Sequence, residues 1–178
     1  MRAQIIPVSI ALMLGGMTAA SAQDFGFQVS NGLTLEQVVI TQENTTSAPT
    51  TSASDGSSSV ISQQGSDNSA SSSISNSQNA GTLVLQQGVS NTAVAVIQDS
   101  PGSAIAQAQL GSDNYTAAAI IGGSENGIAS AQIGNSLSNS VALVNSVGTK
   151  IVYGQAGQGY SGGIVVRNAP RGTVVKLN

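Results

Sequence analysis

The stretch "LQQGVSNTAVAVIQ" (residues 85–98) places carboxamides and a glycine beside a run of small and aliphatic residues, and it contains no charge. A lone strand that enters an apolar core would avoid Gln86 and Asn91, because burying an unpaired carboxamide is unfavourable. The rest of the chain accounts for these amides, because the same pattern returns at a fixed spacing.

Glutamines recur with a 23-residue period, and a glycine stands two positions after each of them. The glutamines are Gln63, Gln86, Gln109, Gln132 and Gln155, and the glycines are Gly65, Gly88, Gly111, Gly134 and Gly157. Asparagines stand five positions after the first three glutamines, at Asn68, Asn91 and Asn114, and an aliphatic residue always stands eleven after, at Ile74, Ile97, Ile120, Leu143 and Val166. A fixed period of this length indicates a repeat architecture.

Each unit divides into two stretches with the length and alternation of β-strands, such as residues 103–109 and 114–120. The glycine of each unit lies in the turn between the two stretches. A glycine at one fixed turn position predicts a backbone site with positive φ, which only glycine occupies without strain.

A single unit cannot be stable alone. Its three or four inward aliphatic side chains contribute about 1.5–3 kcal/mol each, whereas ordering the backbone costs roughly 1–2 kcal/mol per residue. Stacking adds backbone hydrogen bonds and buries each layer against the next. The sequence therefore predicts an all-β fold: a parallel β-solenoid, or β-arcade, of the cross-β type, with five 23-residue strand-turn-strand repeats plus a terminal half repeat.

In this fold each glutamine lies above the next, and each asparagine likewise. A carboxamide both donates and accepts, so such columns can bond along the stack. We interpret the columns as amide ladders for stacking. Two uses stay open at this point: an amyloid ladder that continues between chains, or a satisfied polar seam inside a monomeric solenoid.

Composition excludes several function classes. The chain has no Cys, His or Trp, which removes thiolate nucleophiles, imidazole bases and most transition-metal sites. We expect no enzyme, no catalytic residue, no metal and no cofactor, and we interpret Asp67 and Asp113 as solvated turn acids. Nucleic-acid binding is not expected either, because it requires a broad basic face with interleaved aromatic residues.

Residues 1–22 have a basic start, an apolar run and a small-residue end, which predicts a secretory signal peptide. Residues 23–56 form an N-terminal segment and a Ser/Thr-rich linker, which we expect to be largely unordered. The segment at residues 25–42 alternates like a strand but lies outside the 23-residue phase. We expect the repeat domain to span residues 57–178 and the mature chain to be extracellular.

The unit Ser-x5-Gln-x-Gly-x2-Asn-x-Ala resembles the curlin repeat, the motif of curli fibre subunits in bacterial biofilms. The resemblance covers residues 57–178, about two thirds of the chain. It implies export through the curli outer-membrane channel with its accessory factors, and assembly with other curlin subunits into a cell-surface amyloid fibre for adhesion. The chain departs from the curlin pattern in two places. Aliphatic residues replace the last glutamine of the motif, and Leu137 replaces an asparagine.

The C-terminal end is basic, because Lys150, Arg167, Arg171 and Lys176 all lie from position 150 onward. It resembles the last repeat of the minor, nucleating curlin, which implies attachment to an anionic cell-surface component. A charged edge that discourages pairing is the other interpretation. If the 23-residue period continues, residues 172–178 form the first strand of a sixth unit, with Asn178 on the glutamine column. Lys176 would then face inward, so we expect this strand to slip or stay loose.

Two alternatives to the nucleating subunit remain open on the sequence. One is the major curlin fibre subunit. The other is a monomeric secreted β-solenoid that serves as an adhesin or as a surface- or ice-binding protein.

Overall fold

The computed structural model describes residues 37–43, 50–53 and 56–178, which belong to one compact unit at residues 32–178. The predicted signal peptide and most of the predicted linker lie outside the described residues. The regular structure of the described part consists of β-strands. Within these ranges no helix has the length and apolarity needed to cross a membrane.

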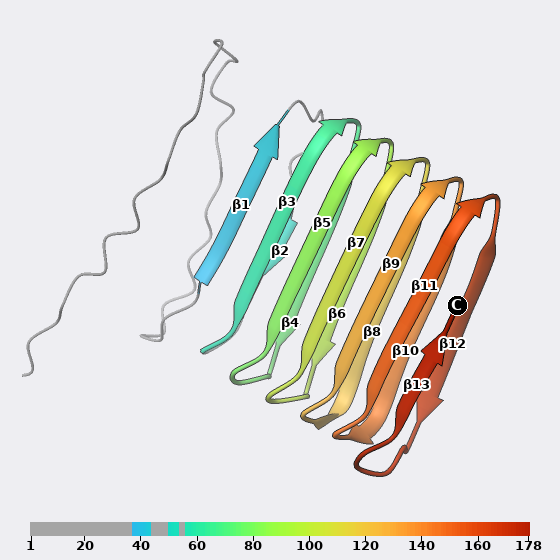
Figure 1. Ribbon diagram of the computed structural model, residues 1–178. Helices are drawn as coiled ribbons and strands as arrows, with labels where there is room; N and C mark the ends of the chain where they lie inside the picture. Colours follow the sequence, from blue (N-terminus) through green and yellow to red (C-terminus); the bar gives the residue numbers. More distant parts are fainter. Residues whose placement is uncertain (1–36, 44–49, 54–55) are drawn as a thin grey trace, which may run out of the picture. The chain divides into compact units, whose positions relative to one another are not determined.

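In the described part of the chain, thirteen strands form two parallel sheets that face each other (Figure 1). Sheet A contains the first strand of each layer: β1 (Gln37–Glu43), β3 (Ser58–Ser66), β5 (Gly81–Val89), β7 (Ala104–Ser112), β9 (Gly127–Asn135), β11 (Lys150–Gln158) and β13 (Val174–Leu177). Sheet B contains the second strands: β2 (Thr50–Ser52), β4 (Ser69–Ser75), β6 (Thr92–Gln98), β8 (Tyr115–Ser124), β10 (Ser138–Val147) and β12 (Ser161–Arg167). The fold is the β-solenoid that the repeat predicts.

Strand register follows the sequence period from β3 to β12. Gln63 lies opposite Gln86 in the pair β3–β5, and Ile97 lies opposite Ile120 in the pair β6–β8. Each residue in these strands therefore lies beside the residue 23 positions further on, at the interstrand spacing of about 4.8 Å, and positions that repeat in sequence form columns of one residue type.

The core lies between the two sheets and is narrow. Alternate residues of every strand from β3 to β10 point inward and are buried, as period-two alternation requires. The aliphatic column forms the apolar part of this core: Ile74, Ile97, Ile120 and Leu143 have exposed fractions of 2% or less, and Val166 packs against them at the C-terminal end.

Two strands lie upstream of residue 57, where we expect the repeat domain to begin. β1 pairs with β3 and places Gln42 opposite Gln63, and β2 pairs with β4 and places Thr50 opposite Ser71. Both spacings are two positions shorter than the 23-residue period. This upstream layer is therefore a shortened unit that a search for a strict period misses.

The last strand departs from the expected phase. β13 pairs with β11 so that Val175 lies opposite Ile151 and Lys176 lies opposite Val152, a spacing one position longer than the 23-residue period. The expected slip is confirmed, while the in-phase position of Asn178 on the glutamine column is wrong. The slip places Val175 on the inward side and leaves Lys176 exposed, which avoids burying an ammonium group.

Candidate functional site

The glutamine column is a continuous hydrogen-bonded chain. The Nε2 group of each glutamine donates to Oε1 of the next: Gln63 to Gln86 and Gln86 to Gln109 at 2.7 Å, Gln109 to Gln132 and Gln132 to Gln155 at 2.9 Å. The first four side chains are at most 3% exposed, and Gln155 is half-buried. All donors point toward the C-terminal end, so the column has a direction.

The same amides also join the two sheets. Gln86 donates a second Nε2 hydrogen bond to the Ser69 carbonyl at 3.1 Å, and Gln109 donates to the Thr92 carbonyl at 3.0 Å. Gln132 and Gln155 repeat this contact one and two layers further on. Gln86, Gln109 and Gln132 thus use both N–H groups, and these hydrogen bonds offset the cost of burying the carboxamides.

The asparagine column joins the turns of neighbouring layers. Asn91 donates from Nδ2 to the Gly111 carbonyl at 2.9 Å, and its Oδ1 accepts the backbone N–H of Asn114 at 3.2 Å. Asn114 Oδ1 in turn accepts the backbone N–H of Leu137 at 3.0 Å. Leu137 itself is buried, so the column ends there with an apolar side chain.

The five turn glycines have φ values between 115° and 136°. A Cβ atom on Gly65, Gly88, Gly111 or Gly134 would also overlap the carbonyl oxygen of the glycine in the next layer. Two constraints therefore require glycine at these four positions: the positive φ of the backbone and the close approach of the stacked turns.

A third polar column lies at the opposite turn of each layer. Ser57 Oγ accepts the backbone N–H of Ala80 at 3.2 Å, and Ser103 Oγ accepts that of Asn126 at 3.0 Å. Asn126 Oδ1 accepts the backbone N–H of Thr149 at 3.1 Å. The sequence shows small or polar residues here, but it does not show that their oxygen atoms bond across layers.

Polar groups also lie inside the solenoid, where sequence reasoning did not place them. In the first two layers Ser59 Oγ donates to Ser72 Oγ at 2.8 Å, and Thr82 Oγ1 donates to Ser59 Oγ at 3.0 Å. In the third and fourth layers Asn139 Nδ2 donates to Ser130 Oγ at 2.8 Å, with Thr116 and Gln107 beside this pair. Period-two alternation in phase with the buried glutamines would have located them.

The basic residues do not form one patch. Lys150 and Lys176 lie in sheet A, Arg167 ends β12 in sheet B, and all are exposed. Arg171 lies in the last turn and pairs with Glu125 at 2.6 Å, with both side chains more than half exposed. The four cations therefore surround the C-terminal end of the stack on both faces.

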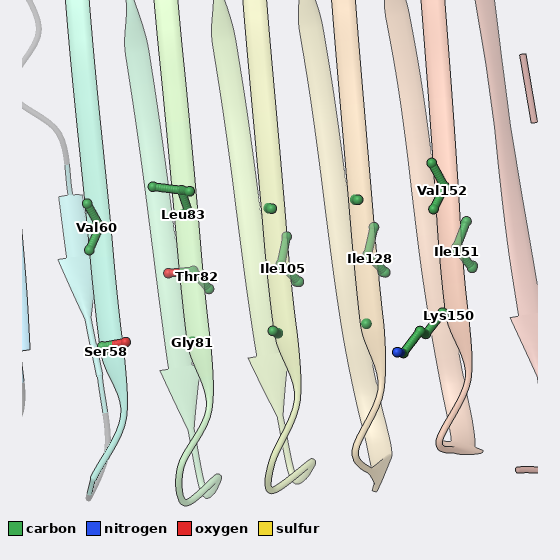
Figure 2. Close-up of a pocket in the computed structure, with 14 residues that line it drawn as sticks. Ser58, Val60, Gly81, Thr82, Leu83, Ile105, Ile128, Lys150, Ile151 and Val152 are labelled. Atoms are coloured by element: carbon green, nitrogen blue, oxygen red, sulfur yellow. The ribbon is translucent and has the colours of Figure 1, made fainter. Parts of the chain in front are cut away.

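The outer face of sheet A carries a shallow apolar hollow of about 460 Å³ (Figure 2). Small residues form its floor across β5, β7 and β9, namely Gly81, Ala104, Ala106, Gly127 and Ala129. Leu83 and Val152 stand at its two sides, and Lys150 is the one charged residue that lines it.

The turn acids Asp67 and Asp113 are exposed, and both have positive φ, of 56° and 57°. In the described part of the chain no three His, Cys, Asp or Glu side chains are grouped so that they could hold a metal ion.

Together the columns define a class of protein: a parallel β-solenoid whose layers are joined by buried amide ladders. Comparison with protein-family models, curated proteins and solved structures gives no match.

Proposed function

We propose that the chain is a secreted structural subunit of curli-type amyloid fibres, which nucleates or templates polymerisation at the cell surface for adhesion and biofilm matrix. The observation that carries the proposal is the glutamine column, a buried amide ladder in register with parallel strands from Gln63 to Gln155. Such a ladder is the element that stacks identical layers in cross-β assemblies.

The outermost described strand at the N-terminal end of sheet A supports the proposal. β1 is the outermost described strand of sheet A at the N-terminal end, so its second edge offers backbone N–H and C=O groups to another strand. Exposed strand edges recruit further strands. The proposed partners are other curlin subunits, with export through the curli channel and its accessory factors, and an anionic cell-surface component for Lys150, Arg167, Arg171 and Lys176.

The test uses the mature chain, from residue 23, added in trace amounts to a soluble curlin-type subunit with the same 23-residue repeat. The lag time of fibre formation is followed by dye fluorescence, and the fibres are checked for the cross-β reflections at about 4.8 Å and at about 10 Å. We expect a shorter lag. An unchanged lag over a range of seed concentrations would overturn the templating role.

The two alternatives give other outcomes in the same preparation. A major fibre subunit would assemble rapidly alone into long fibres. A monomeric solenoid would sediment as a folded monomer for days and would not alter the lag time of the soluble subunit.

A further inference from the structure

The outer face of sheet A is a broad apolar surface with no described segment of the chain packed on it. Exposed aliphatic side chains lie on the neighbouring strands β5, β7, β9 and β11, namely Leu83, Leu85, Leu110, Ile133 and Val152. A contiguous exposed patch of this kind marks an interaction site when it exceeds a few hundred Å².

This face has a ridge and a trough. The strand register places Val60, Leu83, Ala106, Ala129 and Val152 in one row across β3, β5, β7, β9 and β11. The two alanines in the middle of the row form the floor of the hollow, and the larger side chains stand at its sides (Figure 2). Two positions further along the strands the row repeats the same order, with Leu85 beside the alanines of β7 and β9.

The same face is nearly free of charge. The strands β3, β5, β7 and β9 contain no charged residue, and β11 contains one, Lys150, at its first position. The outer face of sheet B is more polar, because hydroxyl groups recur on β4 and β10, at Ser71, Ser73 and Ser140. The apolar face of sheet A is therefore the better candidate for a contact.

The area of this face is large enough for a stable contact. Each of the five strands from β3 to β11 has nine residues. With strands about 4.8 Å apart and a rise of about 3.3 Å per residue, they cover roughly 700 Å². Two such faces in contact bury about 1,400 Å² together, which lies within the range of specific protein interfaces, about 1,200–2,000 Å².

We propose that the outer face of sheet A is an interface between two copies of this chain. The copies pack face to face about a two-fold axis that runs parallel to the strands and over β7, the middle one of the seven described strands of the sheet. This rotation keeps the position along each strand and reverses the strand order. It places β5 over β9 of the second copy, and β3 over β11 of the second copy.

The side chains of the two faces are complementary in this arrangement. Leu83 lies against Ala129 of the second copy, so the ridge on β5 enters the trough on β7 and β9, and both copies make this contact. Lys150 lies against the uncharged Ser58, at the edge of the interface, where its ammonium group reaches solvent. A large side chain against a small one fills the space between two sheets, and no like charges meet.

The interface is distinct from the ends of the stack and goes beyond the proposed function. Stacking uses the backbone edges of the terminal strands, whereas this contact uses the flat side of the sheet. The two stacks then lie side by side and run in opposite directions.

The first experiment measures the association of the freshly prepared mature chain by sedimentation equilibrium. Ala106→Lys places a charge on the two-fold axis, where it meets its own copy, and Ala119→Lys is the matched control on the outer face of β8 in sheet B. We expect dimers for the unsubstituted chain and for Ala119→Lys, and at least tenfold weaker association for Ala106→Lys. A monomeric unsubstituted chain, a dimeric Ala106→Lys variant or a monomeric Ala119→Lys variant would overturn the proposal.

The second experiment uses smaller substitutions and tests the geometry. The chain has no cysteine, so Val60→Cys and Val152→Cys each carry one thiol on the outer face. In the proposed dimer, Val60 lies across the interface from Val152, at the sheet-to-sheet distance of about 10 Å, whereas the two copies of Val60 are four strand spacings, about 19 Å, apart along the sheet. A bifunctional thiol reagent with a reach of about 10 Å is added before fibres form.

We expect covalent dimers in an equal mixture of Val60→Cys and Val152→Cys and none with either variant alone, as measured by mass spectrometry of the joined peptides. Cross-links with each variant alone would show that equal layers face each other, which contradicts the proposed axis. No cross-link in any sample would overturn the interface itself.

This proposal and the proposed function fail in different experiments. An unchanged lag time of the soluble subunit removes the templating function and leaves the dimer. A monomer in sedimentation removes the interface and leaves the templating function.

Discussion

Lys176 lies opposite Val152, and both side chains point to the outer face of sheet A. In strict phase with the 23-residue repeat, Lys176 would lie beside Tyr153 and face inward. One additional residue in the preceding turn reverses this orientation, because a one-residue slip exchanges the two faces of a strand.

The one-residue slip of β13 predicts that Lys176 is accessible to an amine-reactive reagent. Lys150 and Lys176 are the two lysines of the chain, and both are exposed. We expect an amine-reactive reagent to acylate both at similar rates in the folded mature chain, as measured by mass spectrometry of the peptides. Selective protection of Lys176 would show that the strand is in phase and that its ammonium group is buried.

Gln109→Leu tests the glutamine column at its centre. The substitution leaves an N–H of Gln86 and Oε1 of Gln132 without partners, and each unpaired buried group costs about 1–3 kcal/mol. We expect the free energy of unfolding in urea to fall by roughly 2–5 kcal/mol. Gln87→Leu is the matched control, because Gln87 is exposed, and we expect a change within about 0.5 kcal/mol.

A double substitution tests whether the glutamines act as one connected column or contribute to stability independently. Gln109→Leu with Gln132→Leu removes two neighbouring members together, so within the column only the outer groups of Gln86 and Gln155 lose partners. We expect the double variant to lose less stability than the sum of the two single variants, measured by the same unfolding experiment. Simple additivity would argue against a connected column.

Gly111→Ala tests the stacked turns. Gly111 has a φ of 122°, and a Cβ atom there would overlap the Gly134 carbonyl oxygen. We expect a loss of about 2–5 kcal/mol in unfolding free energy from backbone strain and overlap together. Gly159→Ala has a φ of 72° but open space around the added atom, and it should lose only the strain of about 1–2 kcal/mol. If both variants lose the same unfolding free energy, the close approach of the stacked turns does not contribute to the loss.

Ile120→Gln tests the aliphatic column at the position where the curlin pattern has glutamine. Ile120 is fully buried among Ile97 and Leu143, so a carboxamide there has no column of its own kind to join. We expect a loss of roughly 3 kcal/mol or more from lost apolar burial and an unpaired amide. Ile121→Gln, on the exposed face, should change the unfolding free energy by less than about 1 kcal/mol. A stable Ile120→Gln variant would show that this position accepts an amide ladder.

The sequence predicts the parts of the fold that repeat. The spacing from Gln63 to Gln155 predicts parallel strands in register, because one period fixes which residues stack. The turn glycine predicts positive φ, although the overlap of Gly111 with the next turn depends on the distance between layers. Where the spacing changes, a strict period gives no information. β1 joins the stack two positions short of the period, and β13 joins it one position beyond the period.

Side-chain bonding across layers was harder to predict than strand position. Ser103 and Asn126 stand at a column of small or polar residues, yet their role depends on an oxygen atom that reaches the backbone N–H of the next layer. Gln107 and Asn139 were missed for another reason. Each belongs to a single layer, so a search for recurring residues passes over it.

The central claim is that the buried glutamine column, whose first hydrogen-bonded pair is Gln63 with Gln86, templates an incoming layer. The most direct test compares the lag time of a soluble curlin-type subunit seeded with the mature chain, with its Gln63→Leu variant and with Gln64→Leu. Gln63 is buried, and its neighbour Gln64 is exposed on the outer face. We expect the unsubstituted chain and Gln64→Leu to shorten the lag time equally, and Gln63→Leu, checked to be folded by circular dichroism, to shorten it much less. Equal lag times with all three seeds would contradict the claim.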